Sequence, residues 1–158
     1  MNKLILASSS PSRLRLLKSA GINPQVLVSG VDEESPEITA LEPSEMVLAL
    51  AILKAHTVKN IAPTNSLILG CDSTFEFNGQ SLGKPETKEN AIKRAKLLSG
   101  KFGYLHTGHC LIDLKQEIEL TERSTAKVQF AEMTDAEIND YVDSGEPLNV
   151  AGGFTLDG

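Results

Sequence analysis

Residues 3–17, KLILASSSPSRLRLL, decide the first part of the fold and indicate where a ligand binds. The run at residues 4–7 is apolar and has the length of a buried strand, and a row of serines then interrupts the pattern. Ser10 suits a helix N-cap and Pro11 suits the first helical position. The sequence therefore predicts a strand, a serine-rich turn and a helix with Arg13 in its first turn.

This junction has the properties of an anion site. The start of a helix leaves backbone N–H groups without intrahelical partners and carries about half a positive charge, so it suits a phosphate. Serine hydroxyls and the guanidinium of Arg13 would add further donors. The alternative interpretation is an ordinary capped helix whose arginine is only solvated, and this stretch alone does not decide between the two.

Composition narrows the class of protein. The chain has 158 residues, which matches a single domain with a substantial core. Its net charge of -6, 4% aromatic content and lack of Trp argue against binding a nucleic acid polymer. The longest apolar run, residues 46–53, is shorter than the roughly 20 residues of a membrane span, and residues 3–7 are too short for a signal-peptide core. We therefore expect no membrane partner and a cytoplasmic location.

The cysteines and two of the histidines show no metal-binding spacing. Cys71 and Cys110 fall in apolar, strand-like runs and are predicted to be two buried thiols. His106 and His109 are three residues apart, which places them on opposite faces of a strand. A role in the core is therefore favoured over a joint metal site.

An acidic loop and a buried lysine follow the first helix. Glu33 lies in the loop at residues 31–43, where a charge run is usually a solvated surface but carboxylates near a phosphate site can also hold Mg²⁺. The helix predicted over residues 44–59 is apolar on every face at its centre. Lys54 lies on the buried stripe of this helix, so it either extends to solvent or reaches into a cleft.

Asp72 follows a short buried strand at residues 67–71 and stands at its carboxyl end, where ligand crevices open in α/β sheets. A hairpin with an Asn-Gly turn is predicted over residues 74–82 and should bring Lys84 back toward Asp72. The other predicted elements are a strand at 25–28, a helix at 87–98, strands at 104–114 and 117–130, and a helix from the capping box at 134–137 to Gly145. The expected architecture is an α/β or α+β domain with a mixed sheet.

Nine motifs, in order, carry a family resemblance: ASSSPSRLRLL, VDEE, LKA, LGCDS, LGKP, LSG, HTG, YVDSGEP and AGGFTLDG. Together they resemble the Maf (septum formation) family over essentially the whole chain. The resemblance implies an α/β fold similar to that of inosine triphosphate pyrophosphatases, with a mixed sheet flanked by helices and two lobes around a cleft. It also implies one Maf-like domain over residues 1–158, a homodimer, and hydrolysis of a nucleoside triphosphate to a monophosphate and pyrophosphate.

The resemblance also implies roles for individual residues, and the charged ones coincide with those selected above on physical grounds. Catalysis falls on Asp72, Lys54 and Lys84, and Glu33 with Asp72 would hold a divalent cation, Mg²⁺ or Mn²⁺. Substrate contacts fall on Ser8, Ser10, Arg13, Ser12, Ser73 and Asp157.

Ser12, Ser73 and Asp157 occupy the positions at which subfamilies differ. They match neither the dTTP/UTP pattern nor the 7-methyl-GTP pattern, so the preferred base stays open. Family members also continue past AGGFTLDG, which leads us to expect that a C-terminal helix and strand are missing and that apolar surface is exposed.

Two other functions remain open at this point. One is a non-catalytic, nucleotide-binding regulator of septum formation, against which the intact Asp72, Lys54 and Lys84 argue. The other is a sugar-phosphate or phosphomonoester hydrolase, which would release orthophosphate.

Overall fold

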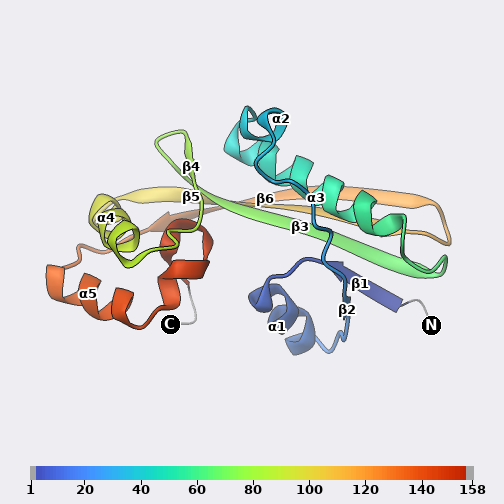
Figure 1. Cartoon of the computed structure of the whole chain (residues 1–158), viewed down its shortest axis with the longest axis horizontal. Helices are drawn as coiled ribbons and strands as arrows, with labels where there is room; N and C mark the ends of the chain where they lie inside the picture. Colours follow the sequence, from blue (N-terminus) through green and yellow to red (C-terminus); the bar gives the residue numbers. More distant parts are fainter. Residues whose placement is uncertain (1–2, 156–158) are drawn as a thin grey trace. The chain divides into compact units, whose positions relative to one another are not determined.

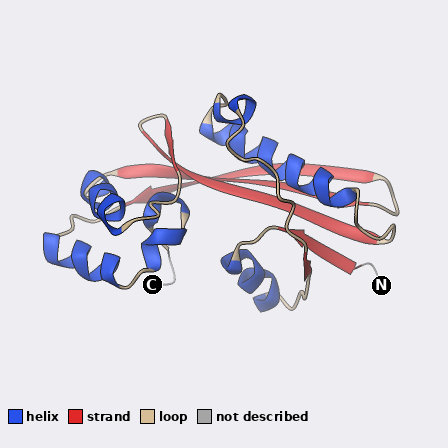
Figure 2. Cartoon of the chain, viewed as in Figure 1, coloured by secondary structure: helices blue, strands red, loops and turns tan. Residues whose placement is uncertain are grey.

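A computed structural model describes residues 3–155, and these fall into two compact units. The first unit holds the described residues up to Asp72 together with Thr107–Ser124, and the second holds Ser73–His106 and the described residues from Thr125 onward. One six-stranded sheet has the order β2-β1-β3-β5-β6, with β4 paired to β3. Three strands, β3, β5 and β6, contribute residues to both units (Figure 2). The mixed α/β fold is as predicted.

The first unit begins with the predicted strand, turn and helix. Its elements are β1 (Lys3–Ala7), α1 (Pro11–Ser19), β2 (Gln25–Val26), α2 (Pro36–Thr39), α3 (Pro43–Lys59) and parts of β3 (Ser66–Phe77), β5 (Phe102–Asp113) and β6 (Ile118–Gln129) (Figure 1). The hydroxyl of Ser10 caps α1, and Pro11 takes its first position, as expected. Gly21 follows the helix with a φ of 78°, a conformation that glycine adopts without strain.

Two details of the first unit differ from the prediction. The strand expected at residues 25–28 contains only Gln25–Val26, and the acidic loop includes the short helix α2. The strand expected to end before Asp72 instead continues through it, so that β3 is one strand of 12 residues. A carboxylate inside a buried strand is disfavoured unless it has a partner, and the partner of Asp72 is not visible in the local sequence pattern.

Helix α3 packs directly on the sheet because the strands beneath it carry glycine. A Cβ atom at Gly70 of β3 would lie 2.1 Å from the backbone oxygen of Ala51 and 2.9 Å from the Cβ of Ala55. On β5, a Cβ atom at Gly108 would lie 2.3 Å from the Val47 oxygen. The close approach of α3 therefore requires glycine at two positions of the sheet.

The second unit is built on the predicted hairpin and two helices. Its elements are the remaining parts of β3, β5 and β6 with β4 (Gln80–Leu82), α4 (Lys88–Leu98), α5 (Asp135–Asp143) and the 3₁₀ turns Glu146–Asn149 and Ala151–Gly153. Asn78 and Gly79 both have positive φ, as the turn predicts, and Phe77 pairs with Gln80. Thr134 and Glu137 form the expected capping box of α5. Phe75, Phe130 and Phe154 pack edge to face in the core of this unit.

The prediction of two buried thiols is confirmed, and of the two histidines only His106 is buried. Cys71 and Cys110 are free and buried. His106 is buried and bonds through Nδ1 to Thr125 and through Nε2 to Glu76, at 2.8 Å each, whereas His109 is only partly buried. Within residues 3–155, no helix is long and apolar enough to cross a membrane.

Replacing Gly70 by alanine tests the close approach of α3. The new methyl group would overlap backbone rather than a flexible side chain, so we expect Gly70→Ala to lower the free energy of unfolding by about 1–3 kcal/mol in urea titrations. Gly83→Ala is the control, because a Cβ atom there meets nothing within 4 Å. Equal stability of the two variants would contradict this packing.

Candidate active site

The centre of the candidate site is a buried ion pair between α3 and β3. Lys54 Nζ lies 2.6 Å from Asp72 Oδ1, and the two residues are only 7% and 8% exposed. The sequence left open whether Lys54 extends to solvent or reaches into a cleft. The structure shows a buried amine that binds a specific partner, Asp72. The pair also explains how an aspartate stands inside β3, because its charge is balanced within the protein.

Glu33 completes a group of three charges. Its Oε1 atom lies 2.7 Å from the same Lys54 Nζ, but its side chain is 53% exposed. The acidic loop thus contacts Lys54 through Glu33. Lys54 bridges one buried carboxylate and one carboxylate that faces solvent.

Burial controls the protonation of Asp72. Desolvation raises the pKa of Asp72, while the charge and hydrogen bond of Lys54 and the charge of Arg13 oppose this rise. The net direction is upward, so burial, with a smaller contribution from the charge of Glu33, outweighs the two cations. A carboxylate with a raised pKa accepts a proton more readily than an ordinary surface aspartate does.

The serine turn holds Arg13 at the edge of the same site. Arg13 Nη1 donates to Ser8 Oγ at 2.8 Å and to the backbone oxygen of Cys71 at 2.9 Å. Ser10 Oγ accepts from the Arg13 backbone N–H at 3.4 Å. The helix is therefore capped, as one interpretation of the sequence held, but its arginine is bound to the protein rather than only solvated.

The structure thus brings six of the predicted residues together in the first unit: Ser8, Ser10, Arg13, Glu33, Lys54 and Asp72. The Cys71 carbonyl was not predictable as a partner for Arg13, because a backbone group has no residue-type signal. The position of Cys71 beside Asp72 on a strand is the one feature of the sequence that could have pointed to this carbonyl.

The other predicted residues are placed differently. Ser12 lies on α1, where its hydroxyl accepts from Arg15 Nη2 at 3.3 Å. Ser73 and the exposed Lys84 belong to the second unit. The predicted approach of Lys84 to Asp72 stays a prediction, and Asp157 lies outside the described residues.

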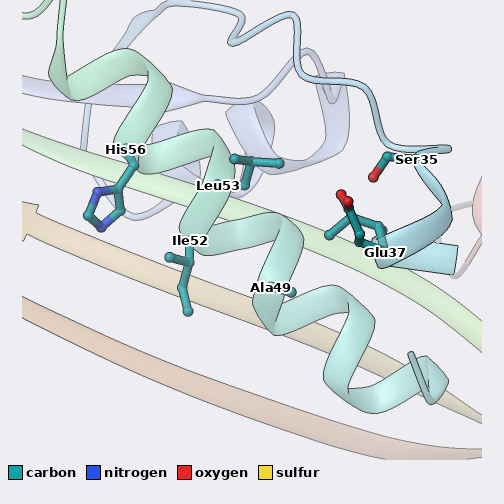
Figure 3. Close-up of a pocket in the computed structure, with 7 residues that line it drawn as sticks. Ser35, Glu37, Ala49, Ile52, Leu53 and His56 are labelled. Carbon is teal, nitrogen blue, oxygen red and sulfur yellow. The ribbon is translucent and has the colours of Figure 1, made fainter. Parts of the chain in front are cut away.

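A separate pocket lies between α2 and α3 (Figure 3). It has a volume of about 540 Å³ and a mostly apolar lining that includes Glu37, Ala49, Ile52, Leu53 and His56. Neighbouring residues of α3 thus have different contacts: Leu53 lines this pocket, and Lys54 is buried against Asp72. None of the charged groups bound to Lys54 lines the pocket.

The donor set of the site suits a hard divalent cation. Oxygen atoms of Asp72 and Glu33 contact one nitrogen, Lys54 Nζ, so the two carboxylates face the same cationic group. Within residues 3–155, no group of three or more His, Cys, Asp or Glu side chains could hold a metal by itself. Mg²⁺ is commonly bound by one or two carboxylates together with substrate phosphates, and this pair fits that pattern.

The fold and the site define an α/β protein with a charged site where a strand, a serine turn and a buried helix meet. The sequence matches the model of the family described as "Maf-like protein" over residues 3–158. The chain belongs to this family, which confirms the resemblance drawn from its motifs.

Several relatives carry the name nucleoside triphosphate pyrophosphatase. The protein of Streptomyces coelicolor is 50% identical over 157 residues, which are 99% of this chain and 75% of the relative. That of Streptomyces avermitilis is 46% identical with the same coverage, and that of Prochlorococcus marinus is 47% identical over 98% of this chain and 82% of the relative. Among solved structures, a lipoprotein from Neisseria meningitidis has a TM-score of only 0.33 at 13% identity, over 92% of this chain and 95% of that one, which supports no conclusion.

Removing the lysine of the buried pair tests its part in the fold. Lys54→Met leaves Asp72 as a buried charge without its amine, and we expect a loss of about 3–5 kcal/mol in the free energy of unfolding. Lys59→Met is a matched control on the same helix, where an exposed lysine should contribute no more than about 0.5 kcal/mol. Chemical denaturation measures both, and a similar stability of the two variants would contradict the importance of the pair.

Proposed function

We propose that the protein hydrolyses nucleoside triphosphates to nucleoside monophosphates and pyrophosphate. The observation that carries the proposal is Lys54 held between Asp72 and Glu33. Two carboxylates and two cations, Lys54 and Arg13, are gathered in one unit, and a triphosphate with its metal needs groups of both kinds. The names of the relatives favour the same activity.

The reaction requires a water molecule to attack the α-phosphorus. The bond between that phosphorus and the bridging oxygen breaks, and pyrophosphate leaves with the electron pair. Asp72 accepts the proton of the water. Lys54, Arg13 and Lys84 offset negative charge on the leaving group.

Asp72 and Glu33 would also hold Mg²⁺ or Mn²⁺, which, when bound, supplies positive charge to the phosphate oxygens. Ser10, Ser12, Ser73 and Asp157 stay proposed substrate contacts on the strength of the family resemblance, which also places Ser8 in this set. The same resemblance supports a cytoplasmic homodimer with one Maf-like domain, and a link to septum formation. The preferred base stays open.

The cleavage position can be tested with a panel of triphosphates and Mg²⁺. Wild-type protein should release a monophosphate and pyrophosphate, and Asp72→Asn should lose most of this activity because the asparagine cannot accept the proton. Product analysis by ion-exchange chromatography distinguishes the outcomes. Orthophosphate as the first product would contradict the proposed cleavage, and calorimetric binding of a non-hydrolysable analogue without any turnover would favour the regulator instead.

The role of Lys84 can be tested against a lysine in the same unit. Lys84→Ala should lower the rate about 10²- to 10³-fold, as loss of one donor to a developing charge typically does. Lys88→Ala is the control, because that exposed lysine pairs with Asp143 on the surface. An unchanged rate in Lys84→Ala would remove Lys84 from the site.

A further inference from the structure

Arg13 is fixed at both ends of its side chain. Its backbone N–H is bound by the Ser10 hydroxyl at the start of α1. At the other end, one guanidinium nitrogen, Nη1, donates to two acceptors, Ser8 Oγ and the Cys71 carbonyl. A long arginine side chain otherwise loses rotamer entropy when it becomes ordered, and here that loss occurs on folding rather than on binding.

The Cys71 carbonyl accepts Arg13 because β1 has ended. The two parallel strands pair up to Ala7, which lies opposite Gly70. Cys71 is the next residue of β3, beyond the last paired position. A buried backbone carbonyl requires a hydrogen-bond partner, and the guanidinium provides it where the neighbouring strand no longer does.

Ser8 is the residue that joins this anchor to the turn. It is 7% exposed, and its oxygen accepts from Arg13 Nη1 at 2.8 Å and from the Ser10 backbone N–H at 3.2 Å. A hydroxyl oxygen has two acceptor lone pairs, so both are used within the protein. The Ser8 hydroxyl thus connects the Arg13 guanidinium and the start of α1 to the end of β1.

We infer that Ser8 is a positioning residue, whose hydroxyl oxygen works with the Cys71 carbonyl to hold the Arg13 guanidinium beside Asp72. This assignment rests on the proposed function, and it deepens that function by giving Ser8 an indirect role in place of the substrate contact that the resemblance implies. The anchoring carbonyl belongs to the residue before Asp72, and the charge of Arg13 acts on the Asp72 carboxyl. A triphosphate then meets a cation that is already oriented.

The kinetic test is a double-mutant cycle on pyrophosphate release. Ser8→Ala should lower kcat/KM about 10-fold when Arg13 is present and less than about 2-fold when Arg13→Gln has already removed the guanidinium. Ser19→Ala is the control, since the hydroxyl of that serine donates to the Arg15 carbonyl at the far end of α1. Equal losses in the two Arg13 backgrounds would overturn the inference, because Ser8 would then act without Arg13.

A second measurement does not depend on activity. In wild-type protein, NMR should show Arg13 guanidinium signals with slowed rotation and slow exchange, assigned through their absence in Arg13→Gln. Ser8→Ala should lose this protection and Ser19→Ala should keep it. Protection that survives in Ser8→Ala would overturn the inference even if the enzyme is active.

The two measurements separate the possible failures. If wild-type protein hydrolyses no triphosphate, the proposed function fails and the NMR comparison alone decides whether Ser8 positions Arg13. If Ser8→Ala does not fold, Ser8→Cys fills the same space with a weak acceptor and should show the same loss of protection. Full protection in a folded Ser8→Cys variant would count against the role of the hydroxyl oxygen.

Discussion

The site depends on the contact between Lys54 and Asp72, at 2.6 Å inside the first unit. Removing an amine and a carboxylate from water costs several kcal/mol for each ion, which only a close partner offsets. The pair in turn requires α3 to lie very near β3. Gly70 permits this, because any side chain there would meet the backbone of Ala51. A glycine two residues before the aspartate is thus a structural condition for the chemistry.

The positive charges near Asp72 do not fully offset the cost of burying its carboxylate. Although Lys54 lies within hydrogen-bond distance and Arg13 adds a second positive charge, burial still raises the pKa of Asp72. A fully compensated salt bridge would lower it. The fold therefore holds a carboxylate whose ionised form is stabilised less than it would be in water, and functional sites are where such perturbed groups concentrate. Its burial distinguishes the pair from a surface ion pair such as Lys88 with Asp143.

Local patterns predicted most of the fold, and they failed where a partner distant in sequence decides the structure. The helix expected at residues 44–59 is α3 (Pro43–Lys59), and the caps at Ser10, Thr87 and Thr134 are all observed. The strand was expected to stop at Asp72 because a lone carboxylate is disfavoured in an apolar run. It continues because Lys54, 18 residues earlier, neutralises that charge. The six residues gathered in the first unit were predictable by residue type, whereas the bonds among them were not.

The serine turn shows why its two interpretations were not exclusive. A capped helix and an oriented arginine use hydroxyls of one turn: Ser10 accepts from the backbone N–H of Arg13, and Ser8 accepts from its side chain. Helix α1 contains no fully buried residue, so apolar packing holds it less firmly than it holds α3. Polar bonds at its first turn must then contribute more to its attachment, and the bond to Cys71 connects it to the strand that carries Asp72. The contacts that orient the guanidinium also anchor the helix that carries it.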